Sequence, residues 1–141
     1  MNSQKFVVGG IVGGIVNFLL GWVFFGMLLK NFMTTNNVSM RPQSEMIWWA
    51  LIVGNLCIGF LLAYVIGRTG ASVAKGAATG FVVGLLVCLG YDLIGYATSS
   101  AANSLTVIAA DVAAVTVMSA ITGAVVGGVM AMSGKKSVAA A

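Results

Sequence analysis

The segment GAATGFVVGLLVCLGYDLIGY, residues 76–96, decides the fold class of this chain. It is apolar along nearly its whole length, and it reaches the roughly 20 residues that a helix needs to cross the hydrocarbon core of a bilayer. Asp92 is its one charged residue. The segment therefore predicts a transmembrane helix that carries a carboxylate within the membrane.

Three further segments, residues 6–29, 46–67 and 104–132, have the same apolar character and a sufficient length. Of the 141 residues, 60% are hydrophobic and 7% are charged, whereas a typical soluble domain has about 25% charged residues. So few polar side chains cannot cover an exterior that faces water. We therefore expect one all-α transmembrane domain of four helices over residues 1–141, surrounded by the lipid bilayer.

Polar stretches connect and follow these segments. We expect a loop over residues 30–45, a short basic turn over residues 68–75 and a frayed tail over residues 133–141. Either Asn103 or Ser104 is expected to cap the fourth helix, because both side chains can accept hydrogen bonds from free backbone N–H groups.

The lysine and arginine residues predict the orientation of the chain. Lys30 and Arg41 fall at one end of the helices, and the other end holds Lys5, Arg68, Lys75, Lys135 and Lys136. Because positive residues are retained in the cytoplasm, we expect both termini there. These flanking residues also account for the net charge of +4, so no nucleic-acid partner is expected.

The two halves of the chain resemble each other. The sequence LGWVFFG (20–26) recurs as LGYDLIG (89–95), and the residues before each copy also match: Lys5, Gly10 and Gly14 against Lys75, Gly80 and Gly84. We therefore predict two tandem-duplicated helix hairpins.

Small residues recur at four-residue spacing in the predicted helices. In lipid, hydrophobicity does not drive helices together, and small residues allow the close backbone contact that does. The residues expected at such contacts are Gly10, Gly14, Gly21, Gly76, Gly80, Gly84, Gly123 and Gly127. Helix packing, within the chain or between copies, is the expected role, and pore lining is the alternative.

A second carboxylate, Asp111, is expected at the depth of Asp92. Asp92 precedes the centre of the connection between the third and fourth segments by about as many residues as Asp111 follows it. In an antiparallel helix hairpin, equal distances from the turn imply equal depth. Because a carboxylate in the membrane costs about 2.5–3.5 kcal/mol on insertion scales, this pair is the candidate functional site.

No basic residue lies inside a predicted span to neutralise the pair. The two carboxylates can share a proton, hold a cation between them, or bond separately to water or to nearby hydroxyl groups. The hydroxyl candidates are Tyr91, Tyr96, Thr106 and Thr116. The competing hypotheses are a structural clamp between two helices and a misplaced helix end that leaves both carboxylates near the headgroups.

Asn17 and Asn55 form a second candidate pair, because both fall near the middle of their spans. A hydrogen bond between the two amides is the ordinary expectation for such a pair. The pair could also extend a polar track inward from the aspartates.

The sequence lacks the residues that several kinds of catalysis and cofactor binding require. The chain has no histidine, which excludes Ser–His and Cys–His catalysis and ordinary haem ligation. Cys57 and Cys88 lie in apolar segments, so we expect free thiols that form no zinc site with the three carboxylates. An intramembrane aspartyl hydrolase would also use two aspartates, but the motif around them is missing. We expect no enzyme, no metal and no cofactor.

Four stretches carry a resemblance to a known family. They are GGIVGGIVNFLLGWVFFGMLL (9–29), VGNLCIGFLLAYV (53–65), GYDLIGY (90–96) and DVAAVTVMSAITGAVVGG (111–128). In these stretches the chain resembles a family of small bacterial integral membrane proteins with four helices. The resemblance implies a location in the bacterial inner membrane and no particular activity.

Two functions remain as expectations. One is the binding or conduction of protons or small cations at Asp92 and Asp111. The other is a non-catalytic packing or assembly subunit of a larger membrane complex, whose glycine faces receive another membrane protein. Because so small a chain encloses little on its own, we expect a homo-oligomer or a membrane-protein partner in either case.

Overall fold

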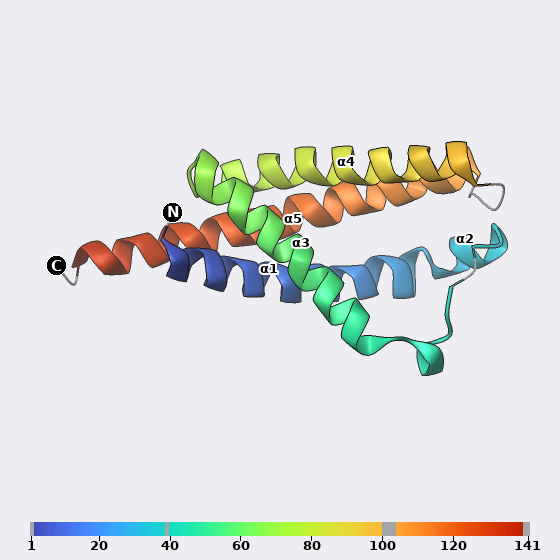
Figure 1. Ribbon diagram of the computed structural model, residues 1–141, viewed down its shortest axis with the longest axis horizontal. Helices are drawn as coiled ribbons and strands as arrows, with labels where there is room; N and C mark the ends of the chain where they lie inside the picture. The colour runs from blue at the N-terminus through green and yellow to red at the C-terminus, as the bar shows by residue number, and fades with distance from the viewer. Residues whose placement is uncertain (1, 39, 100–103, 140–141) are drawn as a thin grey trace.

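Four long helices form the fold in a computed structural model, which describes residues 2–38, 40–99 and 104–139, with side chains of the last helix as far as Ser133. The helices are α1 (Ser3–Val23), α3 (Trp48–Thr69), α4 (Val73–Thr98) and α5 (Leu105–Ala139) (Figure 1). Each is long and apolar enough to cross a membrane. No strand occurs in the described residues, so the expectation of an all-α chain with four such helices is confirmed for them.

The connections contain more helix than the sequence predicts. A π-helical turn, Phe24–Leu28, continues α1, and the expected loop over residues 30–45 contains the short helix α2 (Lys30–Thr35) and a 3-10 turn (Gln43–Glu45). The expected turn over residues 68–75 is reduced to residues 70–72. A frayed tail was expected from residue 133, but α5 continues to Ala139.

Local chemistry explains where the helices end. Gly70 follows α3 with a φ of 91°, a conformation that favours glycine. Ser72 caps α4, because its hydroxyl accepts from the Lys75 N–H at 3.2 Å. Ser104 plays the same part for α5, where its hydroxyl accepts from the Val107 N–H at 3.4 Å; the alternative cap, Asn103, lies outside the described residues.

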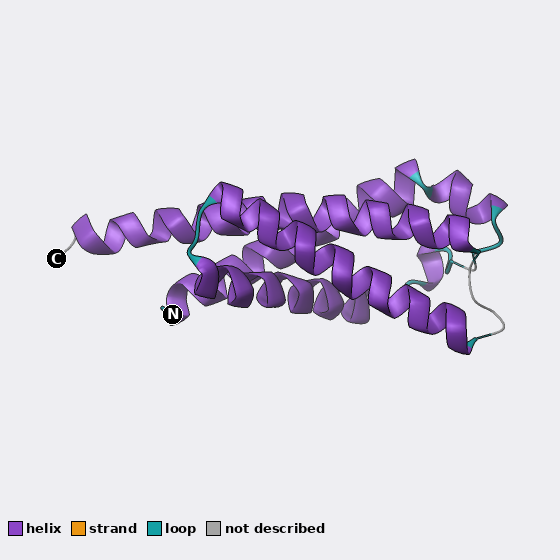
Figure 2. Ribbon diagram, turned by 90° about the horizontal axis from the view of Figure 1, so that it is seen from above, coloured by secondary structure: helices purple, strands orange, loops and turns teal. Residues whose placement is uncertain are grey.

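The helices pack as two pairs, α4 with α5 and α1 with α3, and α5 also joins the pairs through its contact with α1. α4 lies along α5, α1 packs against α3 and α5, and α3 crosses the others obliquely, so its first half diverges from α4 (Figures 1 and 2). We call the end with α2 and the start of α5 the loop end. We call the end with Ser3 and the α3–α4 turn the terminal end. α5 extends beyond the rest of the chain there.

Glycines let the helix backbones touch directly. A Cβ added at Gly76 would meet the Gly123 carbonyl, and one at Gly80 would meet the Ser119 carbonyl. Gly59 of α3 lies equally close to the backbone of α1. Among the other expected packing glycines, an added Cβ would also meet backbone atoms of a neighbouring helix or turn at Gly14, Gly123 and Gly127. At Gly84 it would meet the Ser119 side chain and the Val115 carbonyl, and at Gly10 it would meet the Phe60 ring. Gly21 differs, because a Cβ there would meet only the end of the Met118 side chain in ordinary contact.

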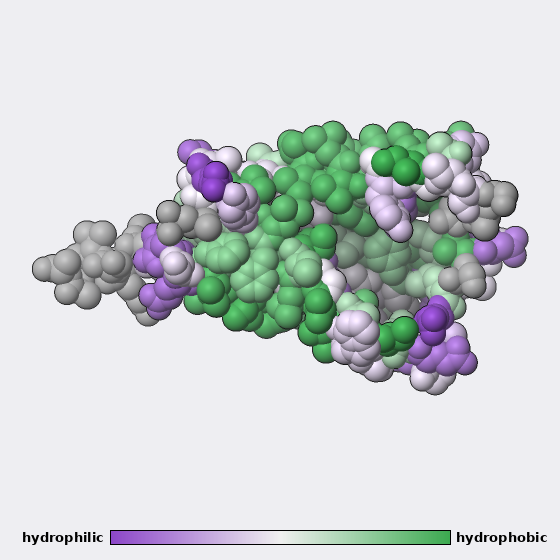
Figure 3. All heavy atoms as spheres, viewed as in Figure 1, coloured by the Kyte–Doolittle hydropathy of each residue, from purple (hydrophilic) through white to green (hydrophobic). Residues whose placement is uncertain are grey.

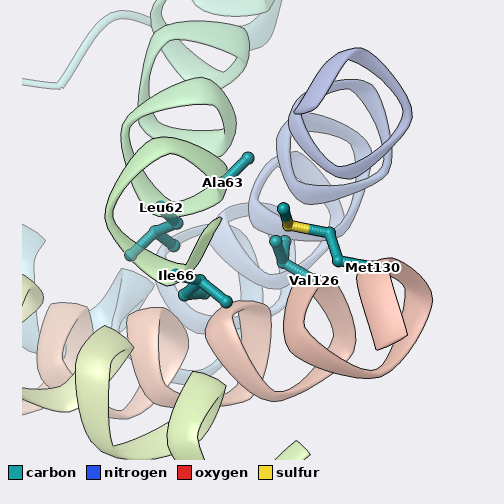
Figure 4. Close-up of a cluster of buried hydrophobic side chains, with 5 residues drawn as sticks. All are labelled: Leu62, Ala63, Ile66, Val126 and Met130. Carbon is teal, nitrogen blue, oxygen red and sulfur yellow. The ribbon is translucent and has the colours of Figure 1, made fainter. Parts of the chain in front are cut away.

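A buried apolar cluster fills the terminal half of the bundle. Its members come from α3 and α5, and they are Leu62, Ala63, Ile66, Val126 and Met130 (Figure 4). On the visible face, hydrophobic residues form a band across the middle of the molecule and hydrophilic residues gather at both ends (Figure 3). This distribution matches the apolar interior and polar margins of a bilayer.

Candidate functional site

Asp92 and Asp111 lie together where α4 and α5 meet, and a thiol joins them. The Cys88 Sγ atom lies 3.5 Å from Asp92 Oδ2 and 3.4 Å from Asp111 Oδ2. The three donor atoms all lie within 4.8 Å of one another. Cys88 is buried and both aspartates are half-buried, so the cluster belongs to the interior of the bundle.

The register of the helix pair explains this meeting. Going along α4, Gly76 faces Gly123, Gly80 faces Ser119, and Gly84 contacts Ser119 and Val115 of α5. One turn further along both antiparallel helices, the same register places Cys88 against Asp111. Asp92 follows on the same face after another turn. The glycine contacts therefore hold the two backbones close enough for one thiol to reach both carboxylates.

Sequence reasoning missed Cys88. It expected free thiols, and both cysteines are free, but it did not expect Cys88 to contact the two carboxylates. The available signal was the four-residue spacing between Cys88 and Asp92, which puts both on one helix face. Cys57 lies apart on an exposed face of α3.

A cavity of about 200 Å³ borders both carboxylates on the loop side of the cluster. Val107 and Ile108 form part of its wall, as does Met33 of α2, which is only 3% exposed. The segment expected to be a polar loop therefore folds over the site. We call this space the loop-end cavity.

The four hydroxyl residues do not form the expected hydrogen bonds to the aspartates. Thr116 is buried, but its hydroxyl donates to the Val112 carbonyl at 2.6 Å. Thr106 is exposed. Tyr91 is 79% exposed, and with Tyr96 it borders a separate cavity of about 380 Å³ that Asp92 also reaches. Both carboxylates contact the Cys88 thiol instead.

Asn17 and Asn55 meet across α1 and α3, as expected. The Asn17 Nδ2 group donates to Asn55 Oδ1 at 2.8 Å, and Asn55 Nδ2 donates to the Leu51 carbonyl at 2.8 Å. Both amides border a largely apolar cavity of about 430 Å³ among the four long helices, which we call the central cavity. Cys88 also borders it, so the thiol lies between the central and loop-end cavities.

Phe25 links the two cavities, because it borders both. It lies in the π-helical turn, where the Leu29 N–H donates to the Phe24 carbonyl at 2.7 Å. Such a turn inserts one residue into a helix and re-aims those that follow it, and it is frequent at functional sites. The sequence alone did not indicate this turn.

No lysine or arginine side chain within residues 2–133 is ion-paired with either carboxylate. The described polar groups of the site are therefore two acids, one thiol and, across the central cavity, two amides. This set can hold a proton or a cation. Comparison with known proteins adds no relative, since no protein-family model, curated protein or solved structure matches the chain.

Proposed function

We propose that this protein binds a proton or a small cation at Asp92 and Asp111 within the membrane. The observation that carries the proposal is the convergence of both carboxylates on one thiol at 3.4 and 3.5 Å. Two half-buried like charges this close within a membrane strongly disfavour each other unless a proton or a cation offsets them. With no described basic side chain paired to them, a shared proton or a bound cation is the remaining source of positive charge.

The cavities favour binding over free passage in this conformation. The loop-end cavity reaches the carboxylates, and the central cavity continues from Cys88 to the amides. Beyond the amides, the cluster around Leu62 and Val126 fills the terminal half without exposed surface. Conduction would therefore require this cluster to open, whereas binding from the loop end requires no such change.

The alternative function is a non-catalytic packing or assembly subunit. Most of the glycines expected to receive a partner already contact helices of the same chain. Gly54, Gly90 and Gly95 are different, because an added Cβ at these positions would meet nothing within 4 Å. A partner helix would therefore use these open glycines, as a homo-oligomer or in a larger complex.

We also propose a location in the bacterial inner membrane with both termini in the cytoplasm. The support is the excess of lysine and arginine at the terminal end, together with the family resemblance. The proposed tandem duplication has the support that each hairpin closes on glycines, Gly14 against α3 and Gly80 against α5.

The test measures the thermal stability of the purified protein while H⁺, Na⁺, K⁺, Mg²⁺ and Ca²⁺ are varied. A ligand that binds only the folded state stabilises it by about 2.7 kcal/mol at a hundred times its dissociation constant. We expect such stabilisation in the native protein and its loss in the double variant Asp92→Asn/Asp111→Asn. Glu45→Gln is the matched control, because Glu45 is exposed in the 3-10 turn.

An equal response of the native protein and the double variant would overturn the proposal. In that case the aspartates act as a clamp between α4 and α5. A positive result is followed by flux measurements in liposomes, which separate a conductor from a binder.

A further inference from the structure

We infer that the site binds a thiophilic divalent ion of the zinc class, with Cys88 as its sulfur ligand beside Asp92 and Asp111. The inference rests on the proposed function, because it names the kind of cation that the carboxylates receive. It also changes the role of the thiol from a neighbour of the site to a ligand. Three protein ligands with an open fourth position are the usual arrangement of a zinc site that exchanges its remaining ligand.

The two sulfur–oxygen distances of the cluster fit one tetrahedral ion. Zinc binds thiolate sulfur at about 2.3 Å and carboxylate oxygen at about 2.0–2.2 Å, so a sulfur and an oxygen on the same ion lie roughly 3.5 Å apart. The two sulfur–oxygen distances here are 3.5 and 3.4 Å. The four-residue spacing on α4 sets the distance to Asp92, and the register of α4 and α5 sets the distance to Asp111, so both are fixed before an ion arrives.

A neutral thiol alone does not satisfy both carboxylates. It has a single proton, and a full hydrogen bond to one oxygen leaves the other oxygen facing the sulfur without a donor. A divalent ion removes this mismatch, because it contacts all three donors and offsets two of the three negative charges that the thiolate and the two carboxylates carry. The same ion supplies the positive charge that the described side chains lack.

Binding exchanges protons for the ion. The metal ligand is the thiolate, so the S–H bond of Cys88 breaks as the sulfur–metal bond forms, and the proton leaves to water. A proton that the two carboxylates share leaves to water in the same way when both bind the ion. No electron is transferred. The loop-end cavity borders both carboxylates and gives room for a water molecule in the fourth position.

The donor set distinguishes between classes of ion. Calcium takes 6–8 oxygen ligands, and magnesium requires near-octahedral oxygen geometry. Two carboxylates and one sulfur suit neither, whereas thiolate sulfur favours zinc and similar soft or borderline ions. We therefore expect Zn²⁺, Cd²⁺ and Co²⁺ to bind and Mg²⁺ and Ca²⁺ to bind far more weakly.

The experiment adds Zn²⁺, Cd²⁺, Co²⁺ or Mg²⁺ to the full-length protein in detergent and measures affinity and ultraviolet thiolate-to-metal charge-transfer absorption. Cys57→Ser is the matched control, because Cys57 is the other cysteine and lies on an exposed face. We expect it to keep the native affinity and the Cd²⁺ absorption band. Loss of an outer-shell partner alone weakens metal binding about 10–100-fold, so Cys88→Ser should weaken it at least 100-fold and abolish the band.

The outcomes separate this inference from the proposal beneath it. If Cys57→Ser shows no charge-transfer band, Cys88 is not a ligand and the inference is wrong, whether or not Cys88→Ser folds. If protons or Na⁺ stabilise the native protein but not Asp92→Asn/Asp111→Asn, and Zn²⁺ has no effect, the proposed function stands and the inference fails. If no ion has an aspartate-dependent effect, both fail.

Discussion

Cys88 takes the place of a fourth glycine on the face that Gly76, Gly80 and Gly84 form on α4. Glycine at the first three positions brings α5 into backbone contact, and the thiol then fills the wider space next to Asp111. The change from glycine to a small polar side chain marks the point where helix packing ends and the site begins. Asp92, one turn further on, borders the loop-end cavity.

At this scale, the first prediction concerns Asp111→Asn. If the carboxylates share a proton as proposed, then in a buffer whose only cation is a bulky organic amine the folded native protein retains a proton that the unfolded chain releases. Its stability should therefore fall as pH rises, by about 1.4 kcal/mol per pH unit while one extra proton is bound. Asp111→Asn has no pair of charges, so its unfolding free energy should vary much less with pH.

Chemical unfolding at several pH values measures this difference. Glu45→Gln should follow the native curve, since Glu45 belongs to an exposed turn. A native protein whose stability rises with pH, or the same slope in all three proteins, contradicts the assignment of a shared proton.

At the scale of helices, α4 and α5 act as one unit whose spacing is set by glycine. The second prediction is that Gly80→Ala destabilises the protein by about 1–3 kcal/mol, the usual range for an overpacked contact. The added Cβ would meet the Ser119 carbonyl, so the two helices must move apart. The same movement should separate Cys88 from Asp111 and weaken the response to cations.

Gly90→Ala is the matched control on the same helix. An added Cβ at Gly90 meets nothing within 4 Å, and alanine favours helix over glycine by about 1 kcal/mol. Unfolding in detergent and the cation-dependent shift should therefore be unchanged or slightly improved in this variant. Equal losses in both variants would show that the glycine contact does not set the geometry of the site.

The long helices could be predicted from the sequence, but the short elements could not. Hydropathy identifies segments such as 46–67 because each residue contributes to the same signal over a whole span. α2 is short and polar, and Met33 becomes buried only because the rest of the fold lies beneath it. The π-helical turn is likewise a tertiary effect, since nothing in FFGML distinguishes it from continued α-helix.

The candidate site could be predicted in part for a related reason. Distance from the turn predicted Asp92 and Asp111 at one depth, because antiparallel helices have a simple register. The register places Cys88 opposite Asp111 and Asp92 one helical turn further on, which is close enough for both carboxylates to reach the thiol. Which side chain lies between them depends on how the two helices rotate about their axes. Small residues fix that rotation through backbone contacts, so Cys88 became visible as a member only in three dimensions.

At the scale of the whole molecule, the two ends of the bundle differ in how they are closed. The loop half contains both cavities, the thiol–carboxylate cluster and the amide pair. The terminal half is filled by Leu62 and its neighbours, which have almost no exposed surface. A proton or cation bound at the aspartates therefore meets a closed apolar layer before it could reach the terminal end.

The third prediction tests this layer with two adjacent leucines. Leu62 is fully buried, whereas Leu61 is 38% exposed. Leu62→Ala should open a cavity beneath the amides and cost about 2 kcal/mol, at the low end for a buried leucine, because lipid provides little hydrophobic driving force. Leu61→Ala should be nearly neutral for stability, since much of the Leu61 side chain already contacts lipid in the folded protein.

The same two variants test whether the layer is the barrier to passage. If it is, liposomes with Leu62→Ala should leak protons or cations faster than those with Leu61→Ala, and Asp92→Asn should reduce the added leak. A leak that is equal in both leucine variants would place the barrier elsewhere. A native protein that already conducts freely would show that the conformation with this closed layer is not the one that conducts.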